Sequence, residues 1–101
     1  MNLNALEEHI IDWGHDKGIL PNPDAMAQFT KTVEECDELF EAIKAKDVDE
    51  VKDAIGDIFV TLVMQCEAWG LNMQECVGSA YEVISKRTGT MVNGVFVKDA
   101  N

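Results

Sequence analysis

Four carboxylates crowd one short segment of the chain, where Glu34, Glu35, Asp37 and Glu38 stand within five consecutive positions. Apolar residues around them recur every three or four positions, the pattern of a helix with one buried face. Glu35 and Glu38 are three residues apart and Glu34 and Glu38 four apart, so their side chains are neighbours that repel by a few tenths of a kcal/mol per pair. Either solvent around an acidic face or a bound cation must offset this repulsion.

A second acidic position lies in the apolar run of residues 51–69, where Asp57 is flanked by Gly56 and Ile58. Asp53 precedes it by one helical turn on the same side. A helix that is apolar nearly all round is expected to be buried, and burying an unpartnered carboxylate costs several kcal/mol. No Lys or Arg stands between positions 52 and 86. The economical explanation is a divalent cation shared with the glutamates of the preceding helix.

The ligand chemistry favours Mg²⁺, with Mn²⁺ as an alternative, because hard cations take carboxylate oxygens together with substrate phosphates. The absence of His and Cys from the ligand set argues against zinc. A di-iron site needs Glu-x-x-His pairs, whereas His9 and His15 both precede the acidic segments. Because so acidic a cluster repels phosphates unless metal ions bridge the two, the residues indicate metal-dependent phosphate chemistry.

Few basic or aromatic residues are available to hold such a substrate. Lys86 and Arg87, expected at the end of a helix, are candidate phosphate contacts, and the alternative is pairing with the helix C-terminus. Lys31 stands four residues before Glu35, which predicts an ordinary ion pair within the helix and makes it a weaker substrate contact. Trp13, close to polar residues, is the candidate for stacking on a base.

Cap residues and periodicity divide the chain into four helices over about 3–15, 23–45, 48–69 and 73–87, followed by a hairpin over about 90–97. Asn22 and Pro23 predict the start of the second helix, and Asp47 and Asn72 the starts of the next two. Asn93-Gly94 is a strong hairpin signal. The expected fold is all-α, a single-domain four-helix bundle over residues 1–101 with a short C-terminal β-hairpin.

The apolar stripes of the two central helices identify the expected core. On the second helix the stripe consists of Phe29, Val33, Cys36, Phe40 and Ile43. On the third helix it consists of Val51, Ile55, Ile58, Leu62 and Trp69. Each set recurs at helical spacing, so each predicts a face that packs against another element.

Composition excludes several classes of protein. The formal net charge of -11 argues against nucleic-acid binding, which needs a basic footprint. No apolar run reaches the length of a membrane span, and no signal peptide is visible. The three cysteines lack C-x-x-C spacing and are interpreted as reduced packing residues. These features favour a cytoplasmic protein, or one in the host cytoplasm if a phage encodes it.

Two motifs resemble those of the MazG-like, all-α nucleotide pyrophosphohydrolases, which carry Glu-Glu-x-x-Glu on one helix and Glu-x-x-Asp on the next. The first is Glu34-Glu35-Cys36-Asp37-Glu38, a full match. The second is Asp53-Ala54-Ile55-Gly56-Asp57, which departs where Ala54 replaces the usual glutamate. Asp53 is the expected substitute. The resemblance extends over about residues 5–90 and is closest to small phage or Firmicute members.

The resemblance implies hydrolysis of ribo- or deoxyribonucleoside triphosphates to a monophosphate and pyrophosphate. It assigns Glu35, Glu38, Asp57 and Asp53 to Mg²⁺, and Glu34 to a second metal or the attacking water. It also implies a homodimer or homotetramer in which a neighbouring chain covers the site, which suits the apolar third helix. Two alternatives stay open: a catalytically inactive regulator that binds metal or nucleotide, and an acidic helical interaction module such as a nucleic-acid mimic or inhibitor.

Overall fold

The computed structural model describes residues 1–99 and contains four helices and one hairpin, as the sequence predicts. The elements are α1 (Leu3–Asp16), α2 (Ala25–Ala45), α3 (Val48–Ala68), α4 (Met73–Ile84), β1 (Gly89–Val92) and β2 (Val95–Lys98). The all-α class with a small terminal sheet is therefore confirmed.

Side-chain caps set the helix starts. Asp47 accepts a hydrogen bond from the backbone N–H of Glu50 at 3.2 Å, and Asn72 caps α4 in the same way, both as predicted. The start of α2 is two residues later than predicted, because Asp24 is the N-cap and accepts from the N–H of Ala27 at 3.0 Å. Asn22 therefore precedes the helix and does not cap it.

The C-terminal ends of α3 and α4 differ in how they are closed. Gly70 follows α3 with a φ of +69°, and the N–H of Leu71 reaches back to the carbonyl of Cys66 at 2.9 Å. This is the Schellman arrangement, in which glycine adopts the left-handed conformation that other residues disfavour. Helix α4 ends at Ile84 and not at Arg87 as predicted, because the chain continues in tighter turns.

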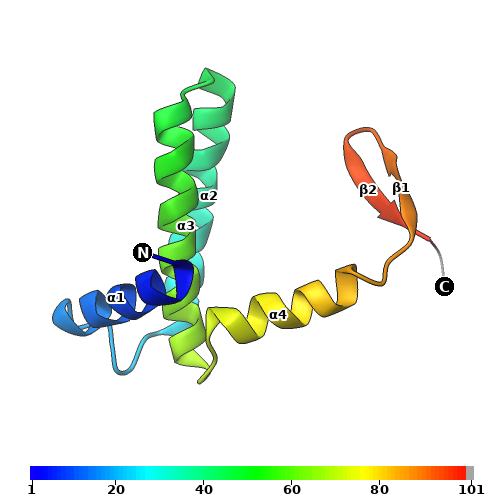
Figure 1. Cartoon of the computed structure of the whole chain (residues 1–101). Coiled ribbons are helices and arrows are strands. Elements are labelled where there is room, and N and C mark those ends of the chain that lie inside the picture. The colour runs from blue at the N-terminus through cyan, green and yellow to red at the C-terminus, as the bar shows by residue number, and fades with distance from the viewer. Residues whose placement is uncertain (100–101) are drawn as a thin grey trace.

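The hairpin has the predicted turn. Asn93 and Gly94 both have positive φ, at 51° and 82°, which is the signature of a type I′ turn. Val92 pairs with Val95 across it in an antiparallel register. The hairpin lies beyond the end of α4, away from α2 and α3 (Figure 1).

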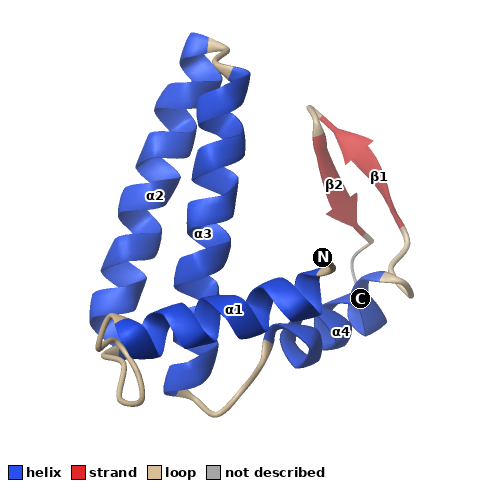
Figure 2. Cartoon of the chain, turned by 60° about the vertical axis from the view of Figure 1, so that its left-hand side comes forward, coloured by secondary structure: helices blue, strands red, loops and turns tan. Residues whose placement is uncertain are grey.

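Helices α2 and α3 form an antiparallel pair, α1 crosses one end of this pair, and α4 leads away from the same end (Figures 1 and 2). The buried core lies at this crossing and contains Leu20, Val63 and Met64. Gly14 of α1 lets the helix approach closely, because a Cβ at this position would lie 2.9 Å from Cε of Met64. The core is therefore small and occupies one end of the helix pair.

The apolar stripe predicted to be buried on α2 is exposed in the chain. Phe29, Val33, Phe40 and Ile43 are 54%, 44%, 58% and 58% exposed. On α3, much of the predicted stripe is exposed as well: Ile55, Leu62 and Trp69. The reason is that α2 contacts α3 through a different face, where Ala42 is buried, and no element within residues 1–99 covers the stripe.

The length and apolar composition of the helices can be compared with those of a membrane span. Within residues 1–99, no single helix is long and apolar enough to cross a membrane. Helices α3 and α4 pass the same test of length and composition only when taken together, across a bend of 101°.

Candidate metal centre

Three carboxylates from the two motifs meet between α2 and α3. Glu35 and Glu38 of α2 and Asp57 of α3 each offer an oxygen, and these three oxygens lie within 4.8 Å of one another. Helices α2 and α3 run antiparallel (Figure 1), and Asp57 of α3 lies beside the two glutamates, which are neighbours on one face of α2. The structure thus assembles three of the four metal ligands that the resemblance implies.

Glu35 is the most strongly desolvated member of this carboxylate cluster. Its Oε2 atom is buried and has no hydrogen-bond partner among residues 1–99. A hydrogen bond shared with Glu38 raises the pKa of Glu35, and burial and the charges of Glu38 and Asp57 raise it further. A buried, unpartnered carboxylate oxygen beside two other carboxylates is poorly stabilised by protein alone. It is well placed to bind a hard cation.

Asp57 does not have the buried surroundings that its sequence neighbours suggested. Its side chain is exposed, so the prediction of a buried Asp57 was wrong. The apolar residues beside it in the sequence lie on other faces of α3, several of which are themselves uncovered. The buried unpartnered oxygen that motivates a cation belongs instead to Glu35.

Ala54, which stands where the resemblance implies a glutamate, is only 3% exposed. Two turns further along α3, Thr61 accepts a hydrogen bond from Thr32 of α2 at 2.8 Å, so this face of α3 is packed against α2. Asp53 is exposed and does not join the carboxylate cluster found within the described residues. The chain therefore has a small buried residue where the resemblance implies a ligand.

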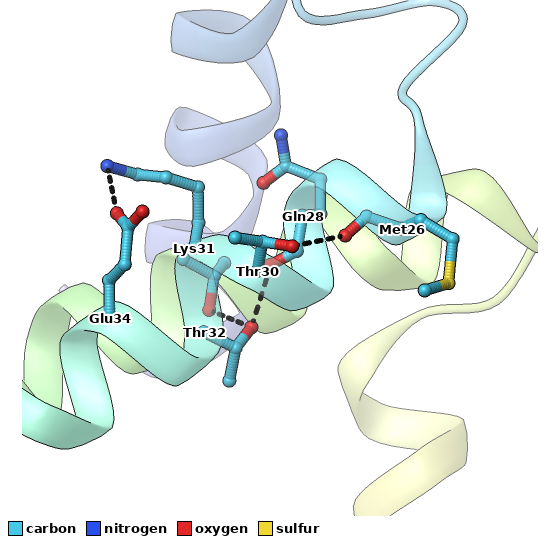
Figure 3. Close-up of polar contacts among 7 residues, drawn as sticks. Met26, Gln28, Thr30, Lys31, Thr32 and Glu34 are labelled. Atoms are coloured by element: carbon cyan, nitrogen blue, oxygen red, sulfur yellow. Dashed lines mark hydrogen bonds and ion pairs between the residues drawn. The ribbon is translucent and has the colours of Figure 1, made fainter.

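Glu34 also lies outside the carboxylate cluster. Its Oε2 is 3.2 Å from Nζ of Lys31 (Figure 3). The ion pair of Lys31 is thus formed with Glu34, three residues on, and not with Glu35 as predicted. Both side chains are more than half exposed, so the pair adds little stability. The same close-up shows Thr30 and Thr32 donating to backbone carbonyls one turn earlier in α2.

The candidate substrate contacts are on other elements. Lys86 and Arg87 follow the end of α4, the helix that leads away from α2 and α3 (Figure 1). Trp13 lies on α1 and is 43% exposed, so its ring is accessible to a ligand. Within one chain, Lys86 and Arg87 are therefore carried away from the carboxylate cluster.

A groove of about 500 Å³ adjoins the carboxylate cluster and shares Glu38 with it. Its lining is Asp37, Glu38, Glu41, Ala42, Ala45, Asp47 and Glu50. Glu41 and Glu50 were not identified as site residues from the sequence. The pattern that could have indicated Glu41 is its position three residues after Glu38, on the same helix face. Such an acidic groove disfavours a polyanion that arrives without cations.

Comparison with known proteins finds a matching family and a phage relative. Residues 25–92 match the family described as the MazG nucleotide pyrophosphohydrolase domain. A protein of Haemophilus phage HP1, described as an uncharacterized 18.2 kDa protein in the rep-hol intergenic region, is 33% identical over 63 residues. That match covers 62% of this chain but only 39% of the phage protein. No solved structure matches the chain.

The matched residues 25–92 contain both acidic motifs and run from the start of α2 into the hairpin. Helices α2 and α3, which carry Glu35, Glu38 and Asp57, lie entirely within them. The chain therefore belongs to the family of MazG nucleotide pyrophosphohydrolase domains.

Proposed function

We propose that this protein hydrolyses nucleoside triphosphates, ribo- or deoxyribo-, to a nucleoside monophosphate and pyrophosphate in a Mg²⁺-dependent reaction. The observation that carries the proposal is the convergence of Glu35, Glu38 and Asp57, with a buried Glu35 oxygen left unpartnered among residues 1–99. Membership of a nucleotide pyrophosphohydrolase family supports the reaction type.

Glu35, Glu38 and Asp57 fit Mg²⁺, or Mn²⁺ in its place, because all three offer hard oxygen donors and carry negative charge. When bound, the ion neutralises these carboxylates, attracts the phosphates and polarises a phosphoryl oxygen. Asp53 is proposed as a fourth ligand, since it stands one turn before Asp57 and its side chain is exposed.

Glu34 is proposed to orient the attacking water and accept its proton, or to hold a second metal. It stands next to Glu35 but is occupied only by an exposed ion pair with Lys31, which a substrate can displace. Water then attacks the α-phosphorus, the bond from this phosphorus to the oxygen that bridges it to the β-phosphorus breaks, and pyrophosphate leaves. General-base assistance of this kind supplies about 10²–10⁴-fold of the rate.

We further propose that a second copy of the chain, in a dimer or tetramer, covers the exposed stripe of α2. The accessible surface is 7680 Å², whereas a compact monomer of 11.2 kDa has about 5,700 Å². The radius of gyration is 16.0 Å, against about 13 Å for a compact domain of this length. An excess of about 2,000 Å² per chain is ample for an obligate homodimer.

In the assembly, Lys86 and Arg87 are proposed to contact the phosphates of the substrate, and Trp13 its base. The direction of α4 supports an intermolecular arrangement, because it carries the two basic residues away from the carboxylates of their own chain. Closure by a second copy also removes water from the site, which strengthens the electrostatic interactions there.

The test is pyrophosphate release from a panel of ribo- and deoxyribonucleoside triphosphates, with Mg²⁺, with Mn²⁺ and with EDTA. Metal-dependent pyrophosphate with matching monophosphate is expected, and Glu38→Gln should lower the rate at least about 100-fold. Glu8→Gln, the same charge change on the exposed side of α1, is the matched control. If no triphosphate releases pyrophosphate but the protein binds Mg²⁺, the result would favour the catalytically inactive regulator. If the protein neither releases pyrophosphate nor binds Mg²⁺, the result would favour the acidic interaction module.

A further inference from the structure

Two cysteines meet where α3 ends and α4 begins. Sγ of Cys66, in the last turn of α3, is 3.8 Å from Sγ of Cys76, in the first turn of α4. Sδ of Met73 lies 3.5 Å from the same Cys66 sulfur. The three side chains line an apolar pocket of about 230 Å³ together with Leu62, Gln65, Trp69 and Leu71. None of them belongs to the carboxylate cluster.

The two thiols differ in exposure. Cys66 is only 7% exposed, whereas Cys76 is exposed to solvent. Burial raises the pKa of Cys66 to about 12, and a hydrogen bond with Cys76 adds to the effect, so Cys66 stays a neutral thiol at physiological pH. An oxidant in solution therefore reaches Cys76 first, with Cys66 held behind it as a second thiol.

We propose that Cys66 and Cys76 form an oxidation site that closes into an intrachain disulfide between α3 and α4. The bond needs a sulfur separation of about 2.05 Å, so the two atoms must approach by less than about 2 Å. This approach requires a shift of the first turn of α4 relative to α3, to which the loop around Gly70 joins it. The first turn of α4 is also held by hydrogen bonds from the N–H of Met73 to Glu7, at 2.9 Å, and from the side-chain amide of Asn4 to Gln74, at 3.5 Å.

The oxidant is a hydroperoxide, with hydrogen peroxide as the simplest member. The Cys76 sulfur attacks the O–O bond, which breaks to give a sulfenic acid and one water molecule. The Cys66 sulfur then displaces the hydroxyl group of this sulfenic acid, its proton leaves with that group as a second water, and the S–S bond forms. Two thiols lose two electrons and two protons, and one peroxide is reduced to two waters.

The bond would fix the direction in which α4 leaves the helix pair. Helix α4 carries Lys86, Arg87 and the hairpin, so the disulfide would hold these elements in one orientation (Figure 2). Because the cross-link restricts the unfolded chain, the oxidised protein should melt several degrees above the reduced one. This site does not depend on the proposed hydrolysis, since it shares no residue with the carboxylates.

The sequence allows a sharp test by peptide mapping after treatment of the full chain with hydrogen peroxide. No Lys or Arg lies between Lys52 and Lys86, so trypsin leaves both cysteines in residues 53–86, whereas Cys36 falls in residues 32–44. The peptide 53–86 should lose two hydrogen atoms, and cleavage after Glu67 should leave two fragments joined until reduction. The peptide 32–44 should keep a free thiol and serves as the internal control.

Variants separate the disulfide from general oxidation. Cys36→Ser should still lose two hydrogen atoms and show the reversible rise in melting temperature. Cys76→Ser and Cys66→Ala should show neither, and Cys76→Ser is the milder change because its side chain is exposed. The proposal is overturned if peroxide leaves all three thiols free. It is equally overturned if Cys76 proceeds to sulfinic acid beside a free Cys66, or if cross-links form through Cys36 between chains.

Discussion

Replacing Glu35 by Gln should make the metal-free protein more stable while abolishing its response to Mg²⁺. The side chain keeps its shape but loses the charge that faces Glu38 and Asp57. In the metal-free state this removes like-charge repulsion and lets the amide donate a hydrogen bond to a neighbouring carboxylate. In the metal-bound state it removes a ligand. One substitution therefore acts in opposite directions on the two states.

The magnitude follows from the separation of the charges. At 4.8 Å, the upper limit of the distances between the three oxygens, two unit charges repel by about 0.9 kcal/mol in water and about 3.5 kcal/mol at an effective dielectric constant of 20. The lower figure applies here, because Glu38 and Asp57 are exposed and screened. With two such neighbours, Glu35→Gln should raise the free energy of unfolding by about 1–2 kcal/mol. That corresponds to a rise of about 4–16 °C in melting temperature.

The gain in the free energy of unfolding from Glu35→Gln depends on pH, in a direction that follows from the raised pKa of Glu35. The pKa of Glu35 is raised above the ordinary value of 4.5, so the folded state holds this proton more tightly than the unfolded state. The wild-type penalty is therefore absent below the ordinary pKa and grows as the pH rises through the raised one. The advantage of Glu35→Gln should accordingly vanish in acid and reach its full size at neutral pH.

The assay is urea unfolding with EDTA and with rising Mg²⁺, for wild type, Glu35→Gln and the control Glu8→Gln. Ligand binding to the folded state should stabilise wild type and the control progressively, with little change in Glu35→Gln. The reasoning is refuted if Glu35→Gln is less stable than wild type in EDTA at neutral pH. It is also refuted if Mg²⁺ stabilises this variant as much as wild type.

Three further substitutions test other parts of the structure. Asp57→Ala should abolish pyrophosphate release and leave the fold intact, because this side chain is exposed; normal turnover would contradict its role as a ligand. Ala54→Glu should destabilise the metal-free protein, because it buries a charge. It should also tighten Mg²⁺ binding as measured by titration calorimetry, and an unchanged affinity would contradict this expectation. Phe40→Asp should yield monomers in light scattering without unfolding the chain, since Phe40 is 58% exposed within it; an intact oligomer would show that another surface forms the contact.

Much of the site could be predicted from the sequence because the two acidic motifs are local patterns. The spacing of Glu35 and Glu38 places them on one helix face, and antiparallel neighbours joined by a short loop bring Asp57 opposite them. The surroundings of these residues could not be predicted in the same way. Apolar neighbours in sequence suggested that Asp57 is buried, but burial depends on how fully other elements cover a side chain, and Asp57 stays exposed beside α2.

The sequence by itself determined the helices, their caps at Asp47 and Asn72, and the type I′ turn at Asn93-Gly94. These features depend on hydrogen bonds and backbone preferences within a few residues, so short patterns are sufficient. Only the tertiary structure decided that an oxygen of Glu35 is left without a partner among residues 1–99 and that Cys66 meets Cys76 across a bend. It also decided that no element of the described part of the chain covers the apolar stripe of α2, because each of these outcomes depends on how separate helices face one another.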